Sequence, residues 1–174
     1  MSTMDIEPLH AQAFFKVNGS SLFSEILIFD YYDREQYYYH LIESEDRYRR
    51  EMESLLTVMN EFLREEKVLV NKKEVEVEPI MVSLDFRGSP ELPTITYLIE
   101  FHAKLFNGLN EYECYYEEGM AEYDYEVYWI FPVNAKITEV EISGEYEILN
   151  DRILIINVRR GEYYNGYEKI VFKL

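Results

Sequence analysis

The chain has one long segment with helical periodicity, and elsewhere its apolar and polar residues mostly alternate as in β-strands. In residues 45–66, apolar side chains recur at spacings of three and four, which is typical of an amphipathic helix. Ser44 precedes this segment as a candidate cap, and acidic residues occupy the first turn. The pattern predicts one helix laid across a sheet, because such a stripe needs an apolar surface to cover it. The stripe consists of Tyr48, Met52, Leu55, Leu56, Met59, Phe62 and Leu63.

Strand-like alternation precedes and follows this helix. Asn18-Gly19 separates the first two alternating segments and favours a tight hairpin turn, since both positions accept positive φ. The stretch 88–93 is rich in Gly and Pro, and its shortness predicts a loop inside one domain. Strands are expected at about 11–17, 22–29, 36–42, 68–70, 74–78, 80–86, 94–106, 110–118, 121–131, 136–142, 145–149, 152–158 and 166–173.

These elements predict an α+β fold that is predominantly antiparallel β. About ten strands would form a bent sheet or a sandwich, with the helix on one face. A length of 174 residues suits a single domain, in which N-terminal hairpins and the helix (1–67) precede a β-rich remainder (68–174). The alternative is a lipocalin-like closed barrel, which would enclose a small-ligand cavity. That cavity would be lined by Tyr97, Phe101, Tyr112, Tyr125 and Trp129.

The charge balance limits the classes of partner. Acidic residues outnumber basic ones 34 to 17, giving a net charge of -17, which argues against nucleic-acid binding because phosphate contacts need clustered Lys and Arg. No window reaches the ~18 consecutive apolar residues of a membrane span, and the N-terminus lacks a signal-peptide pattern. We therefore expect a cytoplasmic protein without membrane association. The one cysteine, Cys114, cannot form an intrachain disulfide and is expected to be buried and inert.

The choice among similar residues points to a source. The chain has 27 Glu but 7 Asp, 15 Ile, and 2 Gln. Thermophile proteins favour Glu and Ile and avoid thermolabile amides, whereas halophiles favour Asp and avoid bulky apolar residues. The composition therefore favours a thermophilic, archaeal source.

A second Asn-Gly pair, Asn107-Gly108, predicts a register. If these residues form a two-residue loop, Phe101 pairs with Cys114 and His102 pairs with Glu113. Apolar side chains then share one face and charged side chains the other. A further hairpin at Gly119-Met120 would place Glu113 opposite Glu126, and like charges directly opposite destabilise a ladder.

This acidic face predicts a metal site as one hypothesis. His102, Glu113 and Glu126 would form a row, with Glu100 and Asp124 nearby. Imidazole with carboxylates suits Mn, Fe or Zn, and carboxylates alone suit Ca or Mg. A divalent cation would be the one cofactor, and it would remove the like-charge repulsion. The alternative is a solvated face where His102 and Glu113 form a weak surface ion pair.

The leading hypothesis is a non-enzymatic binding protein. An acidic, tyrosine-bearing surface suits a basic protein partner, and long hairpin edges also allow a homodimer. The sequence has no G-x-G-x-x-G, P-loop, H-E-x-x-H, C-x-x-C or G-x-S-x-G motif, so nothing marks an enzyme. The expected interaction surface comprises Glu111, Tyr115, Glu117, Glu122 and Tyr128.

Overall fold

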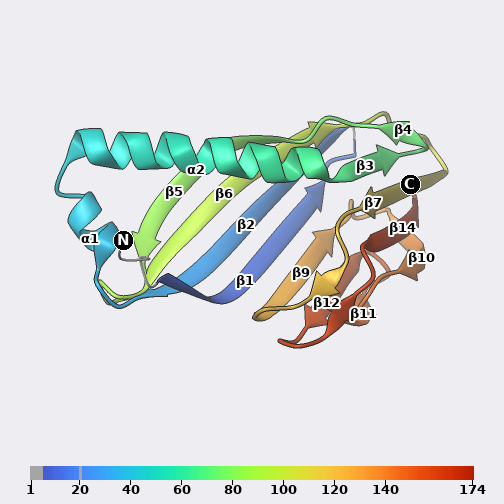
Figure 1. Ribbon diagram of the computed structural model, residues 1–174. Helices are drawn as coiled ribbons and strands as arrows, with labels where there is room; N and C mark the ends of the chain where they lie inside the picture. Colours follow the sequence, from blue (N-terminus) through green and yellow to red (C-terminus); the bar gives the residue numbers. More distant parts are fainter. Residues whose placement is uncertain (1–5, 20) are drawn as a thin grey trace.

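Two open sheets and one long helix make up the molecule (Figure 1). The computed structural model describes residues 6–19 and 21–174. A large sheet has the strand order β11-β12-β9-β1-β2-β6-β5, and a small sheet has the order β10-β14-β7-β3-β4. A short ribbon joins β8 to β13. Every pair of neighbouring strands in the described residues is antiparallel except β1 and β9.

The element bounds follow the chain in order. The helices are α1 (Tyr37–Leu41) and α2 (Glu45–Glu65). The strands are β1 (Ile6–Val17), β2 (Leu22–Asp33), β3 (Lys67–Val70), β4 (Lys73–Glu74), β5 (Glu78–Phe86), β6 (Pro93–His102), β7 (Leu109–Tyr115), β8 (Gly119–Met120), β9 (Asp124–Ile130), β10 (Lys136–Glu141), β11 (Glu145–Leu149), β12 (Ile153–Val158), β13 (Tyr163–Tyr164) and β14 (Tyr167–Lys173).

The expected α+β class is confirmed, and so is the predominance of antiparallel strands. The closed, lipocalin-like barrel is wrong, because both sheets end in open edges, β11 and β5 in the large sheet and β10 and β4 in the small one. The first hairpin is confirmed, with β1 paired to β2. Its loop is longer than the expected two residues, since Val17 pairs with Phe23.

The long helix forms where its periodicity predicts it. α2 runs across the large sheet (Figure 1) and buries Met52 and Met59, of which Met59 clusters with Ile95 and Tyr97 of the sheet. Acidic residues begin the helix and Arg64 ends it, which suits the helix dipole. Ser44 holds the extended cap conformation but makes no side-chain cap hydrogen bond. Phe62, at the margin of the stripe, remains 59% exposed.

The expected strand at 36–42 is wrong, because this segment forms the short helix α1. A buried carboxylate explains the change. Asp33, which is 1% exposed, accepts a hydrogen bond from the Tyr38 backbone N–H at 3.0 Å. Gln36 takes a left-handed conformation, with φ of 55°, that turns the chain out of β2. Local side-chain bonding therefore overrides the β-propensity of the tyrosine run.

The interior consists of two cores that share one face of the large sheet. The helix core lies between α2 and strands β2, β5 and β6, and it includes Met59, Ile95 and Tyr97. The sandwich core lies between the large and small sheets, and it includes Trp129 and Phe172. We call the side of the large sheet that carries both cores its inner face, and the opposite side its outer face.

The register predicted at Asn107-Gly108 is wrong. β6 belongs to the large sheet and β7 to the small one, so the two strands do not pair. Phe101 and Tyr112 instead face each other across the sandwich core, with ring centroids 6.3 Å apart. Alternation identified the inward side chains of both strands correctly. It does not distinguish strands that are neighbours in a sheet from strands that face each other across a core.

A buried amide organises the crossing between the sheets. Asn110 is 1% exposed, and its side chain accepts a hydrogen bond from Phe106 N at 2.8 Å and donates to Phe106 O and Gly108 O. The pairing expected at Gly119-Met120 is also wrong, since β8 pairs with β13 and β9 pairs with β1 and β12. Glu113 and Glu126 therefore lie in different sheets.

Candidate functional site

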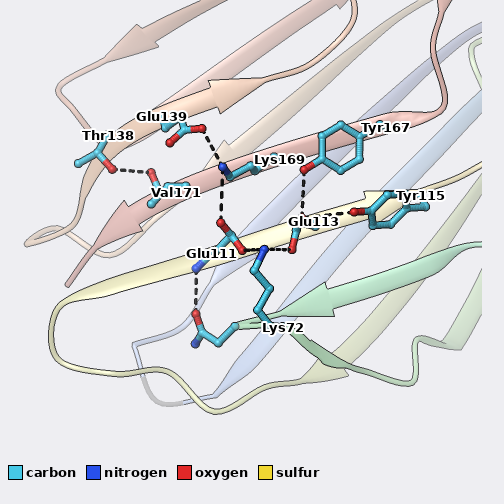
Figure 2. Close-up of polar contacts among 10 residues, drawn as sticks. Lys72, Glu111, Glu113, Tyr115, Thr138, Glu139, Tyr167, Lys169 and Val171 are labelled. Atoms are coloured by element: carbon cyan, nitrogen blue, oxygen red, sulfur yellow. Dashed lines mark hydrogen bonds and ion pairs between the residues drawn. The ribbon is translucent and has the colours of Figure 1, made fainter.

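An ion-pair network, which we call the outer network, lies on the outer face of the small sheet, the side opposite the sandwich core (Figure 2). Lys72 projects from the turn between β3 and β4, and its Nζ lies 2.5 Å from Glu111 Oε1 and 2.9 Å from Glu113 Oε2. Lys169 on β14 lies 3.5 Å from Glu111 Oε2 and 2.8 Å from Glu139 Oε1. Two lysines thus compensate three glutamates across neighbouring strands.

Glu113 is the buried member of this network. It is 5% exposed, and its Oε1 accepts hydrogen bonds from Tyr167 at 3.0 Å and Tyr115 at 3.4 Å. Burial pushes the pKa of Glu113 upward, but hydrogen bonds from Lys72 and Tyr167 outweigh it and leave the pKa below its ordinary value. Glu113 is therefore a charged group in a matched polar site, and Figure 2 shows its oxygens already engaged.

The expected metal ligands are dispersed over the fold. Glu113 lies on the small sheet, while His102 and Glu100 lie on β6 of the large sheet. Glu126 Oε2 instead lies 2.8 Å from His10 Nε2 and accepts a hydrogen bond from Gln12 at 3.2 Å, because β9 runs parallel to β1. Asp124 accepts from the Arg160 backbone N–H at 2.8 Å. Across the described residues, no group of three His, Cys, Asp or Glu is arranged to hold a metal ion.

The expected interaction residues are also divided. Glu111 and Tyr115 belong to the outer network, and Tyr128 lies on the outer face of the large sheet. Glu117 and Glu122 are exposed in the connections on either side of β8. The proposed cavity residues lie inside: Tyr97 belongs to the helix core, and Phe101, Tyr112, Tyr125 and Trp129 lie in or against the sandwich core.

The outer face of the large sheet carries an uncovered apolar row. Six successive strands place apolar side chains directly opposite one another. None of these six side chains belongs to either core. Phe14 and Tyr128 stack in this row with ring centroids 4.7 Å apart. Ile26 is 45% exposed and Met81 is 46% exposed. From β12 to β5, the apolar row is Ile155, Tyr128, Phe14, Ile26, Leu98 and Met81.

Carboxylates border this apolar row. Glu78 and Glu100 stand directly opposite each other in the ladder between β5 and β6, and like charges so placed repel. On the other side of the row, Asp124 and Glu126 project from β9. Lys16 is the neighbouring cation on β1. The outer face thus combines exposed apolar surface with an excess of negative charge.

A third group of carboxylates, which was not predicted from the sequence, lies near the boundary between the two cores. Glu25 is 8% exposed and lies on the inner face of β2, between Phe23 of the sandwich core and Leu27 of the helix core. Glu66 follows α2, and its Oε2 lies 3.9 Å from Cys114 Sγ. Glu168 on β14 accepts a hydrogen bond from the Tyr112 hydroxyl at 3.3 Å.

These three carboxyls, which we call the seam carboxyls, all have raised pKa values. Burial, followed by repulsion from Glu66 and Glu168, raises the pKa of Glu25 from 4.5 to about 8. Desolvation of its carboxyl group raises the pKa of Glu66 to about 7, although the residue as a whole is exposed, and burial with repulsion from Glu66 raises that of Glu168 to about 7. Burial also raises the pKa of the Cys114 thiol, so this cysteine is uncharged, as expected.

The sequence did hold a signal for the seam carboxyls. Glu25 occupies the inward position of a strand whose neighbours on that face are Phe23, Leu27 and Phe29, so a carboxylate there interrupts an apolar series. Glu168 similarly precedes the buried Ile170 and Phe172 on β14. An acidic residue in an inward register position marks a buried titratable group.

Comparison with known proteins adds no family. No family model and no curated protein matches the sequence. Among solved structures, a protein assigned as a protease from Parabacteroides distasonis has 7% identity and a TM-score of 0.36, with coverage of 98% of this chain and 40% of that one. An M1 zinc metallopeptidase from Deinococcus radiodurans has 10% identity and a TM-score of 0.36, with coverage of 95% and 42%. This chain thus spans about two fifths of either protein.

The structure also bears on membrane insertion. Within residues 6–19 and 21–174, neither helix has the length and apolar character that crossing a bilayer requires.

Proposed function

We propose that this chain is a non-enzymatic interaction protein that binds a basic protein partner through the outer face of its large sheet. The observation that carries this proposal is the apolar row, which lies open in the described part of the chain while the inner face holds both cores. Contiguous apolar surface that remains accessible on a folded chain is typical of interaction surfaces.

Charge selects the kind of partner. Carboxylates border the row on both sides, and Glu78 stands directly opposite Glu100 in the ladder. A partner with Lys or Arg around an apolar segment would relieve this repulsion and bury the row. A second copy of this chain would bring a net charge of -17 against the same surface, which disfavours self-association there.

Site-specific photo-crosslinking tests the proposal. A benzophenone amino acid replaces Ile26 in the apolar row, and the matched control carries it at Leu109, which is 64% exposed on the outer face of the small sheet. We expect the probe at Ile26 to capture one basic protein from cells of the source organism, and the purified partner to reproduce the crosslink. Added salt should weaken the crosslink, because the rim contacts are electrostatic.

Two outcomes would overturn the proposal. The first is a crosslink at Ile26 that joins two copies of this chain, which would identify the row as a homodimer interface. The second is an equal yield of the same product from the Leu109 control.

A further inference from the structure

The large sheet ends on one side in β11, and within residues 6–19 and 21–174 no further strand pairs with this edge. β11 pairs with β12 from Glu145 to Leu149 without a register shift. Its free edge is therefore a regular strand whose outward backbone N–H and C=O groups have no partner strand. Such an edge can accept one more strand through backbone hydrogen bonds.

The other three edges of the two main sheets are blunted in ways that β11 is not. β4 has only two residues, and β10 has a register shift next to Ile137. β5 carries Pro79 and a register shift near its start, and its inward side chains Val82 and Leu84 already pack in the helix core. Short strands, prolines and bulges keep a sheet edge from pairing. β11 has neither a proline nor a register shift, which distinguishes it as the edge open to another strand.

β11 presents apolar side chains on one face and carboxylates on the other. Tyr146 and Ile148 pair with buried residues of β12 in the sandwich core, so they point to the inner face. They are nevertheless 49% and 39% exposed. Glu145 and Glu147 point to the outer face, and both are exposed. A strand added at this edge would therefore extend the inner apolar face and meet two carboxylates on the outer face.

The charge on β11 selects the kind of strand that can be added. Antiparallel pairing of β11 with a second copy of itself over its full length is centred on Glu147, which then stands opposite its own copy. Like charges directly opposite each other destabilise a ladder, and a net charge of -17 on each chain adds repulsion. A strand with Lys or Arg opposite Glu145 and Glu147 would instead form cross-strand ion pairs. Apolar side chains at its alternate positions would cover Tyr146 and Ile148.

We propose that β11 binds an extended segment of a partner protein in which Lys or Arg alternates with apolar residues, and that this segment joins the large sheet as an additional strand. Backbone hydrogen bonds to the free edge hold the segment, and the alternation fixes which of its faces meets the glutamates. This site is the edge of the sheet, and it does not rest on the proposed function, which concerns the apolar row.

A synthetic peptide of alternating lysine and valine, added to the full nitrogen-15-labelled chain, tests this site. We expect saturable binding and slower amide hydrogen exchange at alternate residues of β11, because the free N–H groups of this strand acquire partners. Glu147→Lys should weaken binding of the peptide by about fivefold, since it turns a cross-strand attraction into a repulsion. The same variant should bind a peptide of alternating glutamate and valine more tightly than the wild type does.

The matched control is Glu61→Lys, which makes the same change of charge at an exposed position of α2. It should leave the affinity for both peptides close to that of the wild type. A control that weakens binding of the lysine peptide as much as Glu147→Lys does would show that the peptide responds to net charge alone.

N-methylated peptides separate strand addition from general charge attraction. In a strand, the N–H groups of successive residues point to opposite edges, so methylation of all lysine amides blocks one edge and methylation of all valine amides blocks the other. One of these two peptides should therefore lose binding, whereas the other should bind as the unmodified peptide does.

Four results would overturn the proposal. The two methylated peptides behave alike, or a peptide of the same composition with its lysines grouped at one end binds as tightly. Alternatively, hydrogen exchange slows at β5 or β10 and not at β11. The fourth is protection of β11 that rises with the concentration of the chain in the absence of peptide, which would assign this edge to a second copy.

Discussion

Glutamates on the two faces of the small sheet have pKa values shifted in opposite directions. On β14, Lys169 and Glu168 are adjacent in sequence, but Lys169 joins the outer network while Glu168 lies at the seam. Outside, lysines and tyrosines bring the pKa of Glu113 below its ordinary value. At the seam, burial and mutual repulsion raise the pKa of Glu168 to about 7. Burial alone therefore does not set the charge of a glutamate; its partners decide it.

Removal of the seam charge at Glu25 should have the largest effect on stability. Folded Glu25 holds its proton up to about pH 8, whereas the unfolded chain loses it near 4.5, so the free energy of unfolding falls as pH rises between these values. Glu25→Gln removes this loss and should stabilise the protein by about 4 kcal/mol at about pH 8, with little change below pH 4.5. Urea unfolding at both pH values measures the difference.

The control for this experiment is Glu147→Gln, which changes an exposed glutamate on β11. It should leave the free energy of unfolding unaltered at either pH. If Glu25→Gln is destabilising at the higher pH, the carboxylate of Glu25 is compensated in solution, and the contrast between the two faces fails.

Loss of a donor in the outer network should have the next largest effect, with the opposite sign. Tyr167→Phe removes the 3.0 Å hydrogen bond to the buried Glu113 and should destabilise the protein by about 1.5 kcal/mol at neutral pH. The matched variant Tyr115→Phe removes a contact of 3.4 Å from a residue that is 43% exposed, and its effect should be smaller. Equal effects in chemical denaturation would show that Glu113 does not depend on Tyr167.

The third change sharpens the comparison through titration. Lys72→Met removes two ion pairs from the outer network and should raise the pKa of Glu113, because the Lys72 hydrogen bond holds that pKa down. The stability that Glu113 contributes is present above 4.5 and is lost as pH falls through its folded pKa, so acid unfolding should begin at a higher pH in the variant. Carbon-13 NMR of the glutamate carboxyls follows this pKa, and an unshifted Glu113 resonance would contradict the assignment.

The smallest effect is expected at the margin of the network. Glu139 pairs with Lys169 at 2.8 Å, but its side chain is 56% exposed, and exposed ion pairs add little to stability. Glu139→Gln should therefore leave the melting temperature unchanged within error. A clear drop would mean that the outer network acts as one cooperative unit.

The sequence predicts elements well wherever a repeat decides them. The stripe of α2 and the alternation of β1, β2 and β6 identify both the element and its buried side. Pairing is another matter, because Phe101 and Tyr112 have the same inward register whether their strands are neighbours or face each other across a core. The metal hypothesis depended on that pairing. Because the pairing is absent, the predicted ligands lie in different sheets.

The outer network and the seam needed long-range information of a similar kind. Lys72 and Glu113 are 41 positions apart in the sequence. His10 contacts Glu126 because β1 and β9 pair in parallel, and no hairpin turn in the sequence predicts this pairing. Glu25 could have been singled out from its inward register position alone. Glu66 and Glu168, whose charges raise its pKa, come from other elements, and no local pattern predicts this coupling.

The parallel pairing of β1 with β9 has a consequence for the order of assembly. All residues of the helix core lie between positions 6 and 99. The helix and the four strands β1, β2, β5 and β6 can therefore associate as soon as that stretch has left the ribosome. The other edge of β1 pairs with β9, which is synthesised later. Until residues 124–130 are available, this edge exposes unpaired backbone groups to any neighbouring chain. During synthesis, this edge is where premature aggregation would start and where a chaperone would be of use.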